Sequence, residues 1–379
     1  MATELSPLRV LLVAARYFPF MGGLETHVYE VGRRLARASI EVTVLTTDVS
    51  GRLPPVEEAD GMQILRVRAW PTNRDYYFAP DIYRVIIQTR GQWDLVHCQG
   101  YHNLVPPLAM LAAWRANMPF VLSFHSGGDV SRARKMMRGL QWAMLRPLFL
   151  RARKLIAVSE YEASFFRARL RLPSERFVVI PNGAHLSEEP VPAASDSASK
   201  GTLIVSIGRL ERYKGHQRVI AALPKVLEYI PDARVRIVGT GPYEPALHKI
   251  ARRLGVAGRV EIRAVAPDDR GGMAAVITQA NLVTLLSEYE AHPISVMEAL
   301  AYQRPVLVAS TSGLQELADR GLASAIPLAS TPEEVAMAML GQLRKPSTPL
   351  NVALPTWDAC AASLLALYQG IARRVSCAS

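Results

Sequence analysis

Two basic side chains follow a short apolar run in the second half of the chain. Gly208 and Arg209 come just after the apolar run that ends at Ser206. Lys214 lies three residues before a helical pattern that begins at Gln217. Glycine allows a sharp backbone turn there. Arg209 and Lys214 can converge on a diphosphate beside the start of the helix. Two solvated surface cations are the alternative, and the position directly after a strand favours phosphate binding.

Two carboxylates, Glu290 and Glu298, bracket the next polar segment, and the spacing predicts a helix from Ser295 to Tyr302. One carboxylate then lies on a loop and the other in the first turns of the helix. Each can accept two hydrogen bonds from vicinal sugar hydroxyls. For Glu298 alone, an ion pair on the helix surface is the more common outcome.

A histidine ends a strand candidate in the first half of the chain. His125 follows the run Phe120 to Phe124, and Asp129 comes four residues later. A lone histidine is more often structural. At the end of a strand, however, the side chain faces the edge where ligands of parallel sheets bind, which favours a functional role.

The elements that position these residues alternate between strands and helices along the first half. Such alternation is typical of a parallel sheet with crossover helices. A helix is predicted over Leu24 to Ala38, and strands are predicted at Arg9–Ala14, Ile40–Thr46, Met62–Val67, Leu95–Cys98, Phe120–Phe124, Leu155–Val158 and Val178–Ile180.

The second half restarts the same pattern after a segment rich in Pro, Ala, Ser and acidic residues. Its strands are predicted at Leu203–Ser206, Arg234–Val238, Val260–Ile262, Leu282–Leu286 and Pro305–Ala309, and a last amphipathic helix at Trp357–Val375. We therefore predict an α/β chain with a first domain at 1–188, a linker at 189–200, a second domain at 201–356 and a C-terminal helix at 357–379 that crosses back to the first domain.

Composition limits the class of protein. The chain has 379 residues, of which 50% are hydrophobic, and no run approaches the length of a membrane span. Val10 to Ala15 is far too short to span a membrane, and it lacks the basic leader and the small-residue cleavage site of a signal peptide, so we expect a cytoplasmic protein. Cys98, Cys360 and Cys377 fit no metal or disulfide pattern. The net charge of +11 favours anionic ligands or surfaces.

Together the motifs resemble those of the family-4 retaining glycosyltransferases of the GT-B fold, and they occur in the order found in that family. The resemblance covers Pro19 to Glu316, and Trp357 also fits it. It rests on Glu290 to Ala301, Arg209-x4-Lys214, Gly22-Gly23, Val158-Ser159 and Pro181-Asn182-Gly183. The resemblance implies two Rossmann-like domains that face each other across a cleft, with a nucleotide diphosphate sugar as donor.

The resemblance also implies a role for each matching residue. Arg209 and Lys214 would bind the diphosphate and stabilise charge on the departing nucleotide. Glu298 would hold the ribose, Glu290 the transferred sugar, and His125 would contact that sugar near the reaction centre. Further donor contacts would come from the loop glycines, the residue beside the base and the start of the helix, which are Gly22, Gly23, Val265, His292, Pro293, Ile294, Ser295 and Val296.

The chain departs from the family pattern at two places. Ala291 replaces a glycine, which narrows the space near the sugar, and Ser312-Gly313 replaces a glycine pair before Glu316. Gly239-Thr240-Gly241-Pro242 lacks the third glycine of a dinucleotide fingerprint and matches a turn of the glycosyltransferase family instead.

The family implies front-face transfer of a hexose with retention. Because no Asp-x-Asp occurs, we expect no metal or other cofactor.

A basic segment at 132–154 bears on the acceptor. It contains no acidic residue, and Pro147 is expected to kink or end its helix. Met137, Leu140, Met144 and Leu148 recur at helical spacing, and Trp142 and Phe149 add aromatic surface. A basic amphipathic helix on the inner face of an anionic membrane is one interpretation, and it implies a lipid-linked glycan as acceptor. A stripe that faces the core is the other, and a soluble acceptor then fits equally well.

Three other functions compete with glycosyl transfer. A nucleotide-sugar epimerase of the same architecture would bind the donor without transfer. A sugar-binding module without catalysis is disfavoured by the pair Arg209 and Lys214 and by the lack of an export signal. Nucleic-acid binding has only net charge in its favour, and we expect no nucleic-acid partner.

Overall fold

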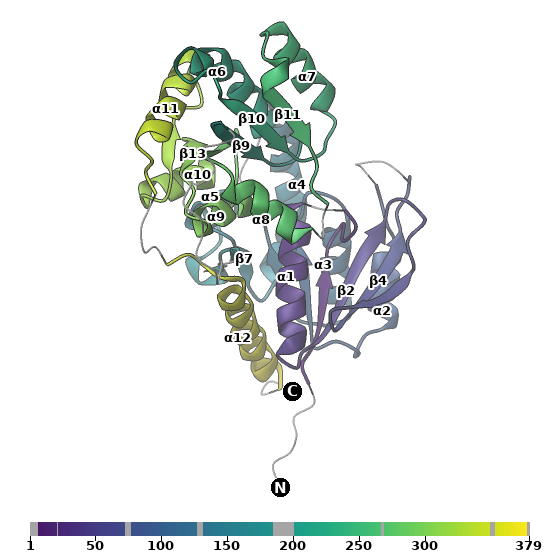
Figure 1. Ribbon diagram of the computed structural model, residues 1–379. Coiled ribbons are helices and arrows are strands. Elements are labelled where there is room, and N and C mark those ends of the chain that lie inside the picture. Colours follow the sequence, from purple (N-terminus) through teal and green to yellow (C-terminus); the bar gives the residue numbers. More distant parts are fainter. Residues whose placement is uncertain are drawn as a thin grey trace. The chain divides into compact units, whose positions relative to one another are not determined.

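The computed structural model describes residues 7–20, 22–72, 77–126, 132–184, 201–266, 269–348 and 353–376 (Figure 1). The chain forms two compact units. The first comprises Met1–Ser126, Arg132–Asn182 and Trp357–Ser379, and the second contains Gly183–Thr356. The predicted linker at 189–200 lies outside the described residues.

The first unit is built on an eight-stranded sheet with the order β3-β4-β2-β1-β5-β6-β7-β8. Neighbouring strands are parallel except β3 and β4. Its central strands are buried and mostly apolar, as expected for strands covered on both faces. The strands are β1 (Arg9–Val13), β2 (Glu41–Asp48), β3 (Val56–Ala59), β4 (Met62–Arg68), β5 (Leu95–Gln99), β6 (Phe120–Ser123), β7 (Leu155–Ala157) and β8 (Phe177–Val179).

Helices cover this sheet, and the last helix of the chain is one of them. The helices are α1 (Gly23–Arg37), α2 (Asp81–Gln88), α3 (Val105–Arg115), α4 (Arg132–Arg151), α5 (Glu160–Leu170) and α12 (Trp357–Ser376). Figure 1 shows α12 beside α1, and the two helices are joined by an ion pair of 2.8 Å between Arg34 Nε and Asp358 Oδ1. Leu364 and Tyr368 bury the inner face of α12.

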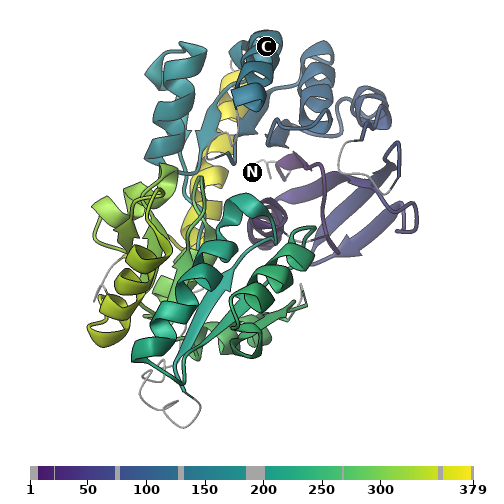
Figure 2. The same ribbon diagram turned by 90° about the horizontal axis from the view of Figure 1, so that it is seen from above.

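The second unit contains a six-stranded parallel sheet with the order β11-β10-β9-β12-β13-β14. Its strands are β9 (Leu203–Ile207), β10 (Arg234–Val238), β11 (Val260–Arg263), β12 (Leu282–Leu285), β13 (Val306–Ala309) and β14 (Ser324–Ile326). Its helices are α6 (His216–Tyr229), α7 (Glu244–Arg253), α8 (Arg270–Thr278), α9 (Ile294–Ala301), α10 (Ser312–Asp319) and α11 (Pro332–Arg344). Helices α6 and α11 pack side by side (Figure 2).

The predicted α/β class with parallel sheets in tandem is confirmed, and every predicted strand is present within two residues at each end. The short edge strands β3 and β14 were not predicted from the sequence. Glu57 and Glu58 interrupt the apolar pattern of β3, and β14 has only three residues. Pro147 was expected to kink or end its helix, and helix α4 runs through it to Arg151, so the helix does not end there. Among the described helices, none combines the length and apolar character that a membrane crossing requires.

Candidate active site

The loop after β9 presents Arg209 to solvent and anchors its backbone to a buried histidine. The Arg209 side chain is 47% exposed, and within the described part of the chain its one ion pair is with Glu211, at 3.1 Å. His216, the first residue of α6, lies 2.8 Å from Ser206 Oγ through Nδ1 and donates from Nε2 to the Arg209 carbonyl at 3.2 Å. Burial lowers the pKa of His216 to about 4, so this ring is neutral at pH 7. The histidine therefore fixes the loop without adding charge.

Gly215 allows this loop to touch the loop after β12. Its φ of +80° lies in the left-handed region, and a Cβ atom there would stand 2.0 Å from the carbonyl oxygen of Leu286. A larger residue would separate the two loops. The contact brings Lys214 within reach of Glu290.

Lys214 and Glu290, both predicted from the sequence, form an ion pair in this structure. Lys214 Nζ lies 2.6 Å from Glu290 Oε1, and the two side chains are 16% and 12% exposed. Ser287 Oγ donates to the same oxygen at 2.8 Å. The carboxylate is thus held in place by two donors, and among the described residues its second oxygen has no hydrogen-bond partner for a ligand to displace.

Ser312 and Gly313, where the chain departs from the family pattern, form hydrogen bonds with the backbone of Glu290. The amide of Glu290 donates to Ser312 Oγ at 2.8 Å, and the amide of Gly313 donates to the Glu290 carbonyl at 2.9 Å. A Cβ atom on Gly313 would lie 1.9 Å from the carbonyl oxygen of Ala291. Ser312, which stands where the family has the first glycine, thus adds a side-chain hydrogen bond to the Glu290 amide. The second glycine is required because the backbone of Ala291 lies against it.

Helix α9 begins beside this loop. His292 and Pro293 are buried, and burial lowers the pKa of His292 to about 4. Pro293 precedes the helix, and its carbonyl accepts from the amide of Val296 at 3.2 Å. The expectation that the Val296 amide contacts a phosphate therefore competes with this hydrogen bond. The amides of Ile294 and Ser295, in the first turn, have no intrahelical acceptor.

Glu298 lies one turn into α9 and is paired. Its carboxylate accepts from Arg270 Nη2 at 2.7 Å, and its side chain is 9% exposed against 39% for Arg270. Val265, which follows β11, packs against the core of the same unit. The helix-surface ion pair that competes with a ribose-binding role is therefore present. An exposed arginine can move aside when a ligand binds, so the pair is compatible with either role.

His125 belongs to the first unit and has an uncommon backbone conformation. Its φ of +52° lies in the left-handed region, where non-glycine residues are rare and often mark functional sites. Its Nε2 donates to Gln99 Oε1 at 2.7 Å. Burial lowers the pKa of His125 well below its ordinary value, so the ring is a neutral group at pH 7.

A row of buried hydrogen bonds connects His125 to α12. Gln99 Nε2 lies 3.2 Å from His97 Nε2, which also lies 2.8 Å from Ser123 Oγ. His97 Nδ1 lies 2.5 Å from the hydroxyl of Tyr368. Because the Gln99 amide donates to His97 Nε2, the proton of His97 stands on Nδ1 and is donated to Tyr368. The C-terminal helix thereby helps to orient His125.

Two further residues support the same edge of the first sheet. The His27 ring lies 4.6 Å from that of His125 and donates from Nδ1 to Asn182 Oδ1 at 2.9 Å. The buried Glu162 accepts from the amides of Ser126 and Val158, so it ties the loops after β6 and β7 together. Burial raises the pKa of Glu162 to about 8.

Gly22 and Gly23 stand at the start of α1, with Gly22 as its extended N-cap. Asp129 lies outside the described residues. Gly22, Gly23 and His125 thus belong to the first unit, and the remaining candidate residues belong to the second.

Sequence reasoning missed Gln99, His97, Ser287, Arg270 and His216. Polar residues inside otherwise apolar strands, such as Gln99, were the available signal. Among the described residues, no three His, Cys, Asp or Glu side chains gather as a metal site would require.

Comparison with known proteins agrees with this geometry. Residues 21–188 match the family described as Glycosyltransferase Family 4, and residues 187–345 match Glycosyl transferases group 1. The chain is 27% identical over 392 residues to a D-inositol 3-phosphate glycosyltransferase of Nocardiopsis dassonvillei. The aligned region covers 92% of this chain and 89% of that protein.

Solved structures share the fold. Sucrose-phosphate synthase from Thermosynechococcus elongatus superposes with a TM-score of 0.79 at 20% identity and covers 98% of this chain and 100% of that one. Anabaena Alr3699/HepE in complex with UDP-glucose gives a TM-score of 0.70 at 19% identity, with 97% and 99% covered. With two family matches in tandem and this architecture, the chain belongs to the family-4 glycosyltransferases of the GT-B fold.

Proposed function

We propose that this glycosyltransferase transfers a hexose from a nucleotide diphosphate sugar to an acceptor hydroxyl with retention of configuration. The observation that carries the proposal is the ion pair of Lys214 with Glu290, which two loops at the carboxyl edge of the second sheet hold together, with Arg209 on the same loop as Lys214. In this proposal the cations bind the diphosphate, and Glu298 binds the ribose once Arg270 moves aside. Alr3699/HepE, whose fold is similar, was solved with UDP-glucose.

The contacts of Glu290 favour a positioning role. Oε1 of Glu290 is already bonded to Lys214 and Ser287, so the carboxylate is better placed to hold sugar hydroxyls than to attack the anomeric carbon. In the proposed front-face reaction, the bond from the anomeric carbon to the leaving phosphate breaks. The acceptor oxygen bonds to the same face, and the leaving phosphate takes the acceptor proton. Arg209 and Lys214 stabilise the phosphate charge that develops. We further infer that no metal is needed.

A thermal-shift screen tests the donor site. We expect one nucleoside diphosphate or its sugar to raise the Tm of the wild type, because a ligand that binds only the folded state stabilises it. Glu298→Ala and Lys214→Ala should lose this shift. Glu228→Ala, which removes an exposed ion-paired carboxylate from the same unit, should retain it. A well-folded wild type that responds to no nucleotide would contradict the proposal.

For the acceptor, we propose a lipid-linked glycan reached from the cytoplasmic face of an anionic membrane. Leu140, Met144 and Leu150 of α4 are 66%, 71% and 42% exposed, and Arg146 is exposed beside them. Three residues that the sequence suggested for this exposed face do not belong to it. Leu148 and Phe149 are buried, and Trp142 packs against Phe165 and Phe166. The side chains of 132–137 lie outside the described residues. A phosphorylated polyol is the second acceptor candidate, since a curated relative is named as a D-inositol 3-phosphate glycosyltransferase.

Vesicle flotation tests the membrane contact. The double variant Leu140→Ser, Met144→Ser should bind anionic vesicles at least about tenfold more weakly, because each exposed apolar side chain contributes on the order of 1 kcal/mol or more when it enters the interface. The matched control Val56→Ser, Met337→Ser removes two side chains that are 56% and 51% exposed elsewhere and should bind as the wild type does. Equal binding by all three proteins would exclude this face of α4.

A further inference from the structure

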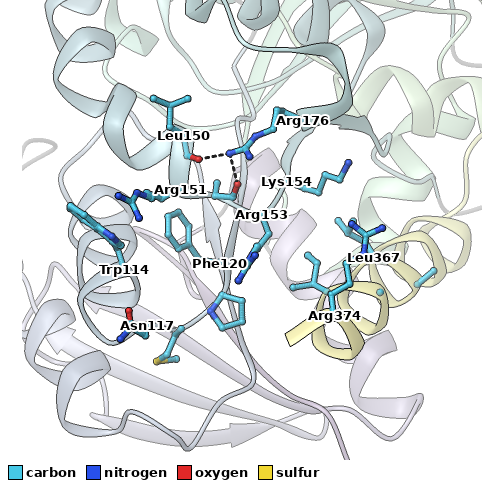
Figure 3. A pocket seen from close by; sticks show the side chains of 16 residues that line it. Trp114, Asn117, Phe120, Leu150, Arg151, Arg153, Lys154, Arg176, Leu367 and Arg374 are labelled. Atoms are coloured by element: carbon cyan, nitrogen blue, oxygen red, sulfur yellow. Dashed lines mark hydrogen bonds between the residues drawn. The ribbon is translucent and has the colours of Figure 1, made fainter. Parts of the chain in front are cut away.

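A cavity of about 650 Å³ lies within the first unit, at the amino ends of β6 and β7 (Figure 3). Its walls come from the end of α3, the segment before β6, the end of α4, the turn before β8, and α12. Phe120 lines the cavity at the start of β6, whereas His125 follows the opposite end of the same strand. The cavity is therefore separate from the candidate residues at the carboxyl edge of this sheet.

The charges around the cavity all have the same sign. Arg151, Arg153, Lys154, Arg176 and Arg374 line it, and its lining, as the described residues define it, includes no Asp or Glu. Like charges gathered in a concave site repel one another and raise the local concentration of anions. A bound anion would relieve this repulsion.

Part of this basic lining is held in position by the protein. Arg176 Nη2 donates to the carbonyls of Leu150 and Ala152, the latter at 2.9 Å, as the dashed lines in Figure 3 show. The Nε of Arg176 is buried and has no acceptor among the described residues. The Arg151 guanidinium lies over the Trp114 ring, 5.1 Å from its centre. Lys154 Nζ donates to the carbonyl of Glu175. Three of the five cations are thus oriented before any ligand arrives.

Two other cations are available to a ligand. Arg153 and Arg374 are exposed, and within the described part of the chain neither forms an ion pair or a side-chain hydrogen bond. Arg153 comes from the turn before β7 and Arg374 from α12, on different walls of the cavity. Guanidinium groups present donors in a planar fork that matches the oxygens of a phosphate.

We propose that this cavity binds the phosphate group of a phosphorylated ligand. Arg153 and Arg374 contact the phosphate from two sides, and Arg176 supplies a pre-oriented guanidinium. The volume leaves room for a polar group attached to the phosphate. The headgroup of an anionic lipid and a soluble phosphate ester offer the same chemistry. Leu150, which is 42% exposed near the end of α4, is one of the residues that line the cavity.

Binding of two probes to the full chain tests the site. Glycerol 3-phosphate is titrated by calorimetry, and vesicles of phosphatidylcholine with phosphatidic acid are used in flotation. The test variant is Arg153→Gln, Arg374→Gln, and the control is Arg252→Gln, Arg253→Gln, which neutralises two exposed arginines at the end of α7. All four positions are on the surface, so each variant should fold, as its Tm verifies.

We expect the test variant to bind at least one probe about tenfold or more weakly than the wild type, since each hydrogen bond to a charged group contributes roughly that factor. The control should bind as the wild type does. Loss of glycerol 3-phosphate binding indicates a soluble ligand, and loss of vesicle binding alone indicates a lipid headgroup. Unchanged binding of both probes, or equal weakening in both variants, would overturn the proposal. An Arg209→Ala background leaves this result unaffected, so it is independent of the donor site.

Discussion

Replacement of Arg209 by alanine is expected to lower the turnover of sugar transfer by about 100- to 1,000-fold, because one oriented cation at a developing phosphate charge contributes that much. The same variant should keep the Tm of the wild type. The Arg209 side chain is 47% exposed and forms an ion pair with Glu211 at the surface. Such exposed pairs contribute about 1 kcal/mol or less. Initial rates with saturating donor and a melting curve on the same sample check both statements.

The control for this experiment is Arg212→Ala. Arg212 is exposed, lies three residues further along the same loop and carries the same charge. It should retain the wild-type rate. If Arg209→Ala transferred sugar at the wild-type rate, the diphosphate role of this loop would be excluded. Lys214→Ala is a less specific probe, because it leaves the nearly buried Glu290 without its cation and should also lower the Tm.

Acid should destabilise the protein steeply below a pH of about 6.5. His27 and His97 in the first unit and His216 and His292 in the second are buried, and burial lowers their pKa values from 6.5 to about 4, 3, 4 and 4. The unfolded chain binds a proton on each ring at its ordinary pKa, whereas the folded chain does not. Their stabilising contribution is therefore complete above about pH 6.5 and decreases as the pH falls toward the folded values.

Each neutral buried histidine costs up to about 1.4 kcal/mol of stability per pH unit in this window. Glu162, whose pKa is raised to about 8, takes up a proton on folding in this range and offsets about one histidine. The net effect is a fall in Tm between about pH 7.5 and about pH 5, which calorimetry at several pH values would measure. His27→Asn keeps the donor toward Asn182 and should remove one proton from the dependence. The exposed His248→Asn should change nothing. A Tm that stays constant across this range would show that these rings are protonated in the folded protein.

Local patterns were sufficient for most of the fold. Apolar runs such as Val10–Val13 predict buried parallel strands because they have no polar face to expose to water. The spacing of Val28, Val31 and Leu35 predicts α1 for the equivalent reason. Pro147 was overestimated as a signal for a helix end, because residues on both sides of it pack into the unit and α4 continues. The edge strand β3 was missed because its pairing with β4, rather than its own sequence, makes it a strand.

For the candidate site, the order of residues along the chain identified Arg209, Lys214, Glu290 and Glu298 as a group, because each follows a strand whose carboxyl end lies at one edge of the sheet. Their partners could not be predicted in this way. The Lys214–Glu290 pair depends on the contact at Gly215, the Glu290 loop depends on Ser312, and His125 depends on Gln99, His97 and Tyr368, which is 271 residues from His97. Hydrogen bonds act over about 3 Å, so they form between whichever residues the packed chain brings together, and separation in sequence has no bearing on them.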